Sequence, residues 1–153
     1  MASGDAPDPG FDPSAIDPAE FARSIRDTPD DQLADGMQSD ARGIVLDGIF
    51  DSMERYVNAD RAQGVDGVID CKILDRPDGG YDHYQVVVRD GGCSVSREPT
   101  ERARVTFRVK PVDFLKLATG NASGPKLFLT GGLKIEGDLM FAARVPDLFR
   151  IPD

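Results

Sequence analysis

An alternating stretch that ends at a proline, residues 104–111, constrains the fold of this chain more than any other feature. Its apolar side chains stand at every second position: Val105, Phe107 and Val109. Polar or charged side chains fill the positions between them: Arg104, Thr106, Arg108 and Lys110. A period of two is typical of a strand with one buried face. Pro111 ends the strand, because proline has no N–H for a neighbouring strand and suits the first turn of a helix.

The residues after Pro111 predict a helix, a short strand and a second helix. Apolar side chains recur at helical spacing over 112–119, and Gly120 is suited to cap that helix. The later segments follow in this order: an apolar run (127–129), a glycine turn (131–132), a short strand (133–136) and a last apolar helix after residue 138.

The residues upstream predict three helices and then three strands. The helices are one that starts at the capping-box sequence Asp17-Pro18-Ala19-Glu20, one from Thr28 to near Gly36, and the longest over 41–58. The strands are 65–73, 81–89 and 93–97, joined to the strand at 104–110 as a meander. This order predicts an α+β fold: an about five-stranded, mainly antiparallel sheet covered on one face by helices.

Charge is distributed unevenly along the 153 residues, a length typical of one domain. The net charge is −9, and residues 1–40 hold ten acidic side chains against two arginines. An acidic surface disfavours binding to nucleic acid, because it has few cations to displace phosphate counterions. We predict that residues 1–16, rich in proline and aspartate, form a flexible acidic tail, and that residues 17–153 form a single domain.

Two negative observations suggest where the protein acts. No apolar run approaches the roughly 18 residues that a membrane span needs, and the first residues do not resemble a signal peptide. We therefore expect a cytoplasmic protein without an integral membrane segment. In that compartment Cys71 and Cys93 are expected to be reduced core thiols rather than a disulfide.

Enzymatic features are scarce in the sequence. His83 is the one histidine, and its place on the outward phase of a strand favours a solvated surface side chain over a catalytic one. No nucleophile elbow, phosphate-binding loop or dinucleotide-binding glycine motif is present. We predict a protein that is not an enzyme, with no catalytic residue, no metal site and no cofactor.

A basic row follows the outward face of the strand at 104–110. It consists of Arg102, Arg104, Arg108 and Lys110. One interpretation is a docking patch for anionic lipid headgroups or a phosphate-bearing ligand, which would allow transient membrane contact. We favour the other, a solvated face whose cations pair with carboxylates such as Asp70, Glu98 or Glu136 on neighbouring segments.

Large apolar side chains are unusually dense between residues 107 and 149. A filled core is the ordinary explanation. Long or aromatic side chains on short, glycine-interrupted elements also suit a pocket for a flexible apolar ligand. Composition leaves both explanations open.

The run from Gly131 to Asp138, followed by an apolar helix and Leu148-Phe149, resembles the carboxyl-terminal part of the sterol carrier protein 2 family. The strand-to-helix unit from Val105 to Gly120 and the helix at 44–56 followed by Gly64-Val65-Asp66-Gly67 are similar to that family as well. The resemblance covers about residues 17–150. Three features depart from the family pattern: Pro146 within the last helix, the acidic amino terminus, and an end without Ser-Lys-Leu.

The resemblance implies a tunnel that binds a sterol, a fatty acid or a fatty acyl-CoA, in a stand-alone protein of bacterial type. The side chains it places on the tunnel are Ile49, Met53, Phe107, Phe114, Leu117, Phe128, Leu133, Met140 and Ala143. Pro146 predicts a last helix that is shortened or kinked. The resulting hypothesis is a non-enzymatic lipid-binding or lipid-transfer protein. The alternative is an interaction module whose apolar face docks on a partner enzyme or on itself.

Overall fold

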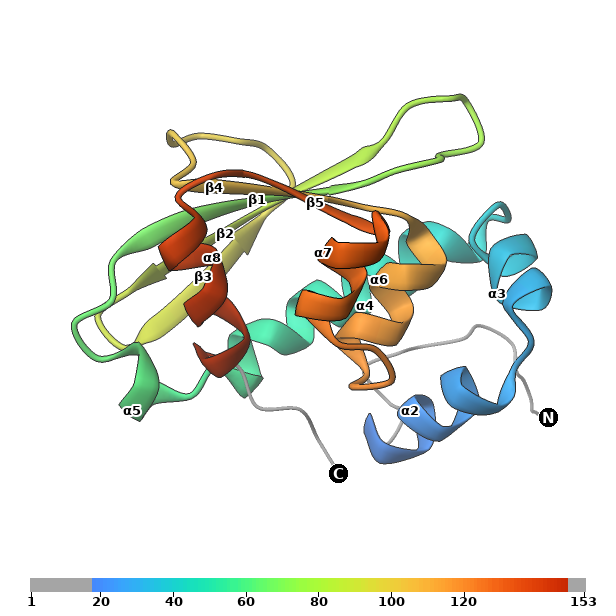
Figure 1. The fold of residues 1–153 in the computed structure, drawn as a ribbon, viewed down its shortest axis with the longest axis horizontal. Helices are drawn as coiled ribbons and strands as arrows, with labels where there is room; N and C mark the ends of the chain where they lie inside the picture. The colour runs from blue at the N-terminus through green and yellow to red at the C-terminus, as the bar shows by residue number, and fades with distance from the viewer. Residues whose placement is uncertain (1–17, 149–153) are drawn as a thin grey trace, which may run out of the picture.

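The structure, a computed structural model, describes residues 18–148 (Figure 1). Its helices are α2 (Pro18–Asp27), α3 (Asp30–Gly36), α4 (Ala41–Tyr56), α5 (Ala59–Ala62), α6 (Pro111–Ala118), α7 (Gly124–Thr130), α8 (Leu139–Arg144) and the 3₁₀ turn η2 (Val145–Leu148). Its strands are β1 (Gly67–Ile73), β2 (Asp82–Arg89), β3 (Gly92–Ser96), β4 (Val105–Val109) and β5 (Leu133–Gly137). The predicted tail, residues 1–16, lies outside the described residues.

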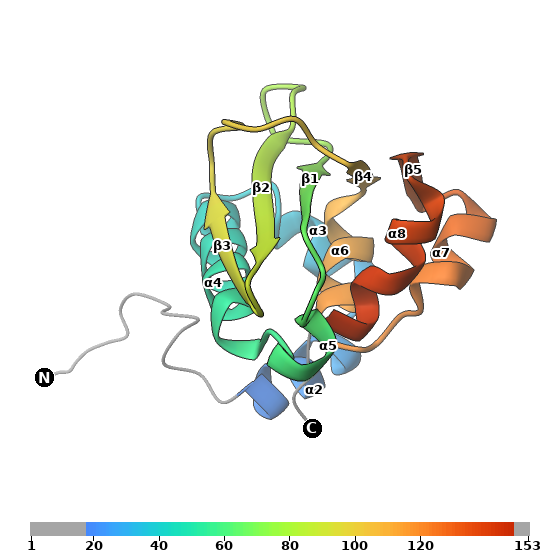
Figure 2. The ribbon, with the colours of Figure 1, turned by 90° about the vertical axis from the view of Figure 1, so that its left-hand side faces the viewer.

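The five strands form one sheet in the order β3-β2-β1-β4-β5 (Figure 2). Three of the four neighbouring pairs are antiparallel, and the β1–β4 pair is parallel, with Ile69 opposite Val105. The helices lie on one side of this sheet (Figure 1). The predicted α+β fold with an about five-stranded, mainly antiparallel sheet is therefore confirmed.

The predicted meander is wrong at one step, because β4 pairs with β1 and not with β3. Gln85 of β2, which is fully buried, holds the crossing segment in place. Its Nε2 donates to Asp70 Oδ1 at 2.8 Å and to the carbonyl of Glu101 at 2.9 Å. Its Oε1 accepts from the N–H groups of Thr100 and Glu101 at 3.0 and 3.1 Å. The chain thus passes across β2 on the way to β4, fixed by one amide side chain.

Helix α4 supplies much of the core on the helical side of the sheet. Leu46 and Phe50 are fully buried. The Phe50 ring stacks on Tyr84 of β2 at 4.0 Å between centroids and on Phe114 of α6 at 5.2 Å. The helix ends at Tyr56, two residues before the predicted end. The Phe50 ring therefore connects the sheet to α4 and α6.

Arg42, near the start of α4, is buried and fully engaged. Its Nε donates to Asp82 Oδ2 at 2.8 Å, where side-chain exposure is 4% for Arg42 and 9% for Asp82. The remaining guanidinium nitrogens donate to backbone carbonyls of the loop before α4 and of the end of β1: Met37, Ile73, Leu74 and Asp75. A buried cation is tolerated only with such partners. Arg42 therefore fixes α4 to the sheet.

The Gly137-Asp138 pair sets the start of α8. Gly137 has a φ of +102°, and a Cβ there would lie 2.6 Å from the carbonyl oxygen of Arg104, so glycine is required. Asp138 accepts the N–H of Phe141 at 3.0 Å and pairs with Arg104 at 2.9 Å. These contacts lower the pKa of the Asp138 carboxyl. Helix α8 is short and passes into η2, as Pro146 predicts.

Candidate functional site

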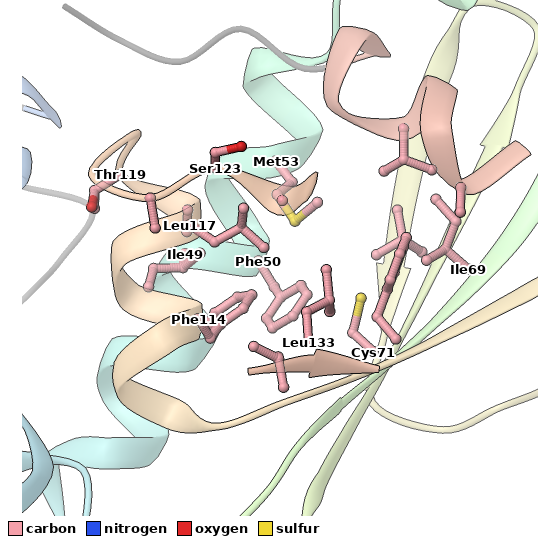
Figure 3. A pocket seen from close by; sticks show the side chains of 18 of the residues that line it. Ile49, Phe50, Met53, Ile69, Cys71, Phe114, Leu117, Thr119, Ser123 and Leu133 are labelled. Carbon is pink, nitrogen blue, oxygen red and sulfur yellow. The ribbon is translucent and has the colours of Figure 1, made fainter. Parts of the chain in front are cut away.

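A cavity of about 690 Å³ lies between the sheet and the helices (Figure 3). Protein interiors are normally packed as densely as organic crystals, so a space of this size is not an ordinary packing defect. Sites for small molecules occupy roughly 300–1,000 Å³. Figure 3 shows Thr119 and Ser123 at one end of the cavity and Ile69 and Cys71 at the other. The size and the lining both suit an elongated apolar molecule.

The sheet forms one wall of the cavity through the inward phase of four strands. The strand residues on this wall are Ile69 and Cys71 of β1, Val86 of β2, Phe107 and Val109 of β4, and Leu133 and Ile135 of β5. Because side chains alternate along a strand, each strand gives this wall only every second residue. All of these side chains apart from the thiol of Cys71 are hydrocarbon. The sheet wall therefore offers a continuous apolar surface.

The helical side explains why the space is not filled. Large side chains of α4 and α6 border the cavity: Ile49, Phe50, Met53, Phe114 and Leu117. The lining also includes residues with little or no side chain: Gly48, Ala118, Ala122, Gly124, Ala142 and Ala143. Small residues at these positions leave open the volume that larger ones would occupy. The small size of these residues therefore accounts for part of the open volume.

Eight of the nine side chains expected from the family resemblance lie on this cavity. They are Ile49, Met53, Phe107, Phe114, Leu117, Phe128, Leu133 and Ala143. Met140 does not line it and is 81% exposed, because the buried side of α8 carries Phe141 and Ala142. That any of the nine contacts a ligand stays a prediction.

Sequence reasoning missed the contribution of α2. Phe21 and Ala22 of this helix line the cavity. The Nδ2 of Asn121, in the loop between α6 and α7, donates to the carbonyl of Ala22 at 2.9 Å and holds α2 at that place. The short apolar stripe of Phe21, Ala22 and Ile25 was the available signal, since Ile25 is buried as well.

The polar side chains on the cavity are Ser52, Arg55, Tyr56, Thr119 and Ser123, of which Arg55 and Ser123 are exposed and mark its rim. Arg55, in the last turn of α4, lines the cavity, is exposed, and makes no ion pair with any described residue. The hydroxyls of Ser52 and Thr119 donate to backbone carbonyls of their own helices at 2.7 Å. Ser123 Oγ instead accepts the N–H of Lys126, which leaves its proton free to donate. Arg55 and Ser123 can therefore bind a polar headgroup while the interior takes an apolar tail.

The lining lacks the usual groups of an acid–base or nucleophilic site. Within residues 18–148, neither a carboxylate nor an imidazole lines the cavity. Cys71 does line it, but burial, with a smaller effect of the Asp70 charge, raises the pKa of its thiol to about 12. The thiol is therefore protonated at neutral pH and behaves as an apolar group. His83 is not on the lining, and its Nε2 lies 3.2 Å from Asp70.

The basic row on β4 is largely neutralised. Arg104 pairs with Asp138 at 2.9 Å, and Arg108 pairs with Glu136 at 3.2 Å, one of the partners expected from the sequence. Arg102 and Lys110 are exposed and form no ion pair within residues 18–148. In the same range no three potential ligand side chains are grouped to hold a metal ion. None of the helices there is both long and apolar enough to cross a bilayer.

Comparison with known proteins finds a matching family model and several similar sequences. A family model described as "SCP-2 sterol transfer family" matches residues 49–150. Human "Sterol carrier protein 2" is 28% identical over 109 residues, covering 69% of this chain and 20% of the human protein. "Sterol carrier protein 2" of Arabidopsis thaliana is 28% identical over 112 residues, covering 69% of this chain and 91% of the plant protein. The chain thus spans a fifth of one relative and most of the other.

A solved structure shares the fold. "Sterol Carrier Protein 2 from Yarrowia Lipolytica (apo form)" superposes with a TM-score of 0.57 at 19% identity, covering 76% of this chain and 97% of that one. At this identity the match concerns the arrangement of helices and strands. The sheet and its helical layer therefore share their arrangement with a protein of known structure.

Proposed function

The chain belongs to the SCP-2 sterol transfer family, and on that premise we propose that it binds a lipid by burying the lipid's apolar part in the cavity beneath the sheet. The single observation that carries this proposal is the apolar cavity of about 690 Å³. The small residues along its helical side support it, because they keep open a space that packing would otherwise close.

Burial of hydrocarbon supplies the binding free energy. Each CH₂ group removed from water contributes about 0.8 kcal/mol, so a tail of about twelve methylenes gives roughly 10 kcal/mol before ordering costs. Association and side-chain ordering consume a substantial part of that sum. The remainder is sufficient for reversible binding, as a carrier requires.

We further propose that the ligand is a sterol, a fatty acid or a fatty acyl-CoA, with its polar end at the rim. Arg55 and Ser123 favour a carboxylate or another oxygen-rich headgroup there, because both can donate hydrogen bonds. The protein would act as a carrier and not as an enzyme. The protonated thiol of Cys71 supports this, since it cannot serve as a nucleophile in the cavity.

The same proposal covers the place of action. Residues 17–153 would act as one lipid-binding unit in the bacterial cytoplasm. In that compartment Cys71, which is buried, and Cys93, which is half-buried, would both stay reduced.

Titration with fluorescent fatty acids and sterols, together with native mass spectrometry of the purified protein, tests the proposal. We expect saturable binding with one of these ligand classes. If no lipid co-purifies and none binds below about 100 µM, which corresponds to roughly −5.5 kcal/mol, the proposal fails.

A pair of variants locates the site. Leu117→Trp adds an aromatic ring at the cavity wall and should lower the affinity about tenfold or more, since the ring takes the volume of the ligand. Ile44→Trp is the matched control, because Ile44 is exposed on α4 and does not line the cavity. Equal affinities for the two variants, with both folded by circular dichroism, would place the ligand elsewhere.

A third variant tests the rim. Arg55→Met should weaken a fatty acid several-fold, because an exposed charge pair is worth about 0.2–1 kcal/mol, and should leave the matching fatty alcohol unaffected. An equal loss for acid and alcohol would remove Arg55 from headgroup binding without affecting the cavity.

The alternative, an interaction module, rests on the apolar side chains that α7 and α8 expose. That hypothesis requires a filled core. The apolar cavity of about 690 Å³ favours lipid binding over it.

A further inference from the structure

The helices cover one face of the sheet (Figure 1), and the other face carries four basic side chains in register. Lys72 of β1 lies opposite both His83 of β2 and Arg108 of β4, and Arg108 lies opposite Lys134 of β5. The residues next to them in sequence point to the helical side, where most of them line the cavity, so these four lie on the open face. We call His83, Lys72, Arg108 and Lys134 the transverse row, because it crosses four adjacent strands.

The transverse row places like charges side by side. Neighbouring strands lie about 4.8 Å apart, and like charges directly opposite one another destabilise a sheet. Lys72, Arg108 and Lys134 each carry a positive charge, and His83 adds one when its imidazole is protonated. The chain contains 27 acidic side chains against 18 basic ones, yet no acidic side chain interrupts the row. The row therefore keeps its positive charges together at a cost to the stability of the sheet.

Two carboxylates beside the row compensate only part of this charge. His83 Nε2 lies 3.2 Å from Asp70 Oδ1, and Arg108 Nε lies 3.2 Å from Glu136 Oε2. Neither contact has the geometry of a hydrogen bond. Within residues 18–148, these two nitrogens are the buried polar side-chain atoms that lack a hydrogen-bond partner. Buried polar atoms are nearly always hydrogen-bonded, so both exceptions mark the transverse row as a place where the protein does not satisfy its own polar groups.

Lys72, inside the row, has no acidic partner in the part of the chain that the structure describes. Its Nζ lies over the ring of Tyr81, 5.1 Å from the centroid. An aromatic ring holds an ammonium group in place without neutralising its charge. The Tyr81 ring is 40% exposed and lies 6.3 Å from the ring of His83, so Tyr81 borders the row. Lys72 is thus positioned on the open face and keeps its charge available for an external anion.

Closely spaced ammonium and guanidinium groups fit the phosphate groups of a ligand, because phosphate oxygens accept charge-assisted hydrogen bonds from both. Arg108 contacts Glu136 through Nε, which leaves its two terminal nitrogens able to donate. Lys72 has a basic neighbour on each side, His83 and Arg108, so the two gaps between them match the two linked phosphates of a diphosphate. The net charge of −9 disfavours an extended polyanion or an anionic surface, since the rest of the protein would repel it. A small soluble ligand avoids that repulsion.

We propose that the transverse row binds the diphosphate group of a small soluble molecule, with Lys72 between the two phosphates and His83 and Arg108 on either side. This site is separate from the cavity, because the row and the cavity lining occupy opposite faces of the sheet. The inference therefore goes beyond the proposed lipid binding and does not rest on it. Its failure would leave the lipid-binding proposal unchanged.

Isothermal titration calorimetry with inorganic pyrophosphate, in the absence of divalent cations, tests the site. We expect saturable binding to the wild type and weaker binding of sulfate, which has one anionic group instead of two. Lys72→Met should lower the affinity for pyrophosphate about tenfold or more, because it removes the cation that both phosphates share. Lys126→Met is the matched control, since Lys126 is exposed on α7, on the helical side. An equal loss in the two variants, equal affinities for sulfate and pyrophosphate, or no saturable binding would overturn the proposal.

A variant that should gain affinity keeps the proposal testable if Lys72→Met does not fold. Glu136→Gln removes the counter-charge of Arg108 at an exposed position, so it should strengthen pyrophosphate binding several-fold. Glu20→Gln, at an exposed glutamate of α2, is its control and should leave the affinity at the wild-type value. An unchanged or lower affinity of Glu136→Gln would contradict the proposal. So would a wild type that binds phosphatidylglycerol vesicles but no pyrophosphate, because a lipid surface would then be the occupant.

Discussion

Helices α4 and α7 are both rich in apolar residues and lie on the same side of the sheet, yet they are used in opposite ways. Leu46 and Phe50 of α4 are fully buried. No residue of α7 is buried, and its Leu129 is 83% exposed. Most apolar side chains among the sixteen residues of α4 face the core, and Ile44 is an exposed exception. The seven of α7 carry theirs at three consecutive positions, 127–129, which cannot all face the core.

The difference shows that an apolar sequence predicts burial only when its spacing gives one face and polar contacts hold that face in place. Arg42 fixes α4 through Asp82 and four backbone carbonyls. Helix α7 is held by an N-cap at Ser123 and by its packing on β5. One helix builds the core, and the other borders a hollow.

Removal of Arg42 should abolish the polar contacts that hold α4, and not α7, firmly on the sheet. Arg42→Met leaves Asp82 buried with only the longer contacts to Arg97 and Arg76, at 3.5 and 3.6 Å, and strands the four carbonyls. We expect the free energy of unfolding to fall by about 3–5 kcal/mol, measured by urea denaturation. Arg61→Met, at an exposed arginine of α5, is the control. A loss no larger than that of the control would show that Arg42 does not fix the helix.

Truncation of one phenylalanine in each helix compares them directly. Phe50→Ala should lower stability by about 3–5 kcal/mol, because it removes a ring that stacks on both Tyr84 and Phe114. Phe128→Ala should lower it by about 1 kcal/mol or less, since nearly half of that side chain already faces water. Urea denaturation of both variants measures the difference. Similar losses would mean that α7 is as much a part of the core as α4.

The two helix caps beside the cavity should respond differently to pH. A carboxyl group whose pKa is lower in the folded state raises the free energy of unfolding at pH values above about 3.9, its pKa in the unfolded chain. This contribution is lost as the pH falls through the pKa of the folded state. Asp138, the cap of α8, has such a pKa. Asp138→Asn keeps an oxygen that can cap but loses the charge, so its deficit at neutral pH should shrink in acid.

The cap of α7 is the matched control for that experiment. Ser123 is uncharged, so Ser123→Ala should give a deficit of about 0.5–2 kcal/mol that does not depend on pH. Urea denaturation at neutral pH and near pH 3 measures both variants. A deficit of Asp138→Asn that stays constant would mean that the cap, and not the charge, carries its effect.

The sequence was sufficient to predict features that depend on local order. The alternation of Val105, Phe107 and Val109 predicts the strand and its inward face, and Pro111 predicts the start of α6. Pro146 predicts the short last helix. Each follows from backbone geometry over a few residues, which is why the boundaries of most elements match within about two residues.

Features that depend on distant partners could not be predicted in the same way. The partners of Arg42 lie up to 40 residues away, and no local pattern marks an arginine as buried. The pairing of β4 with β1 is also a long-range choice. Residues 139–143 of α8 are all apolar, so no polar position marks the outward face, and periodicity could not show that Met140 faces outward. The cavity depends on the sum of side-chain volumes, which only the assembled fold reveals.

The buried amide of Gln85 has a consequence for related sequences. Its four hydrogen bonds need two donors and two acceptors at the end of one side chain of this length, a combination that only glutamine supplies. Glutamate would accept but could not donate, and leucine would do neither. We therefore expect relatives whose chain crosses the second strand in this way to keep a glutamine at its fourth position, and Gln85→Glu to loosen the crossing segment here.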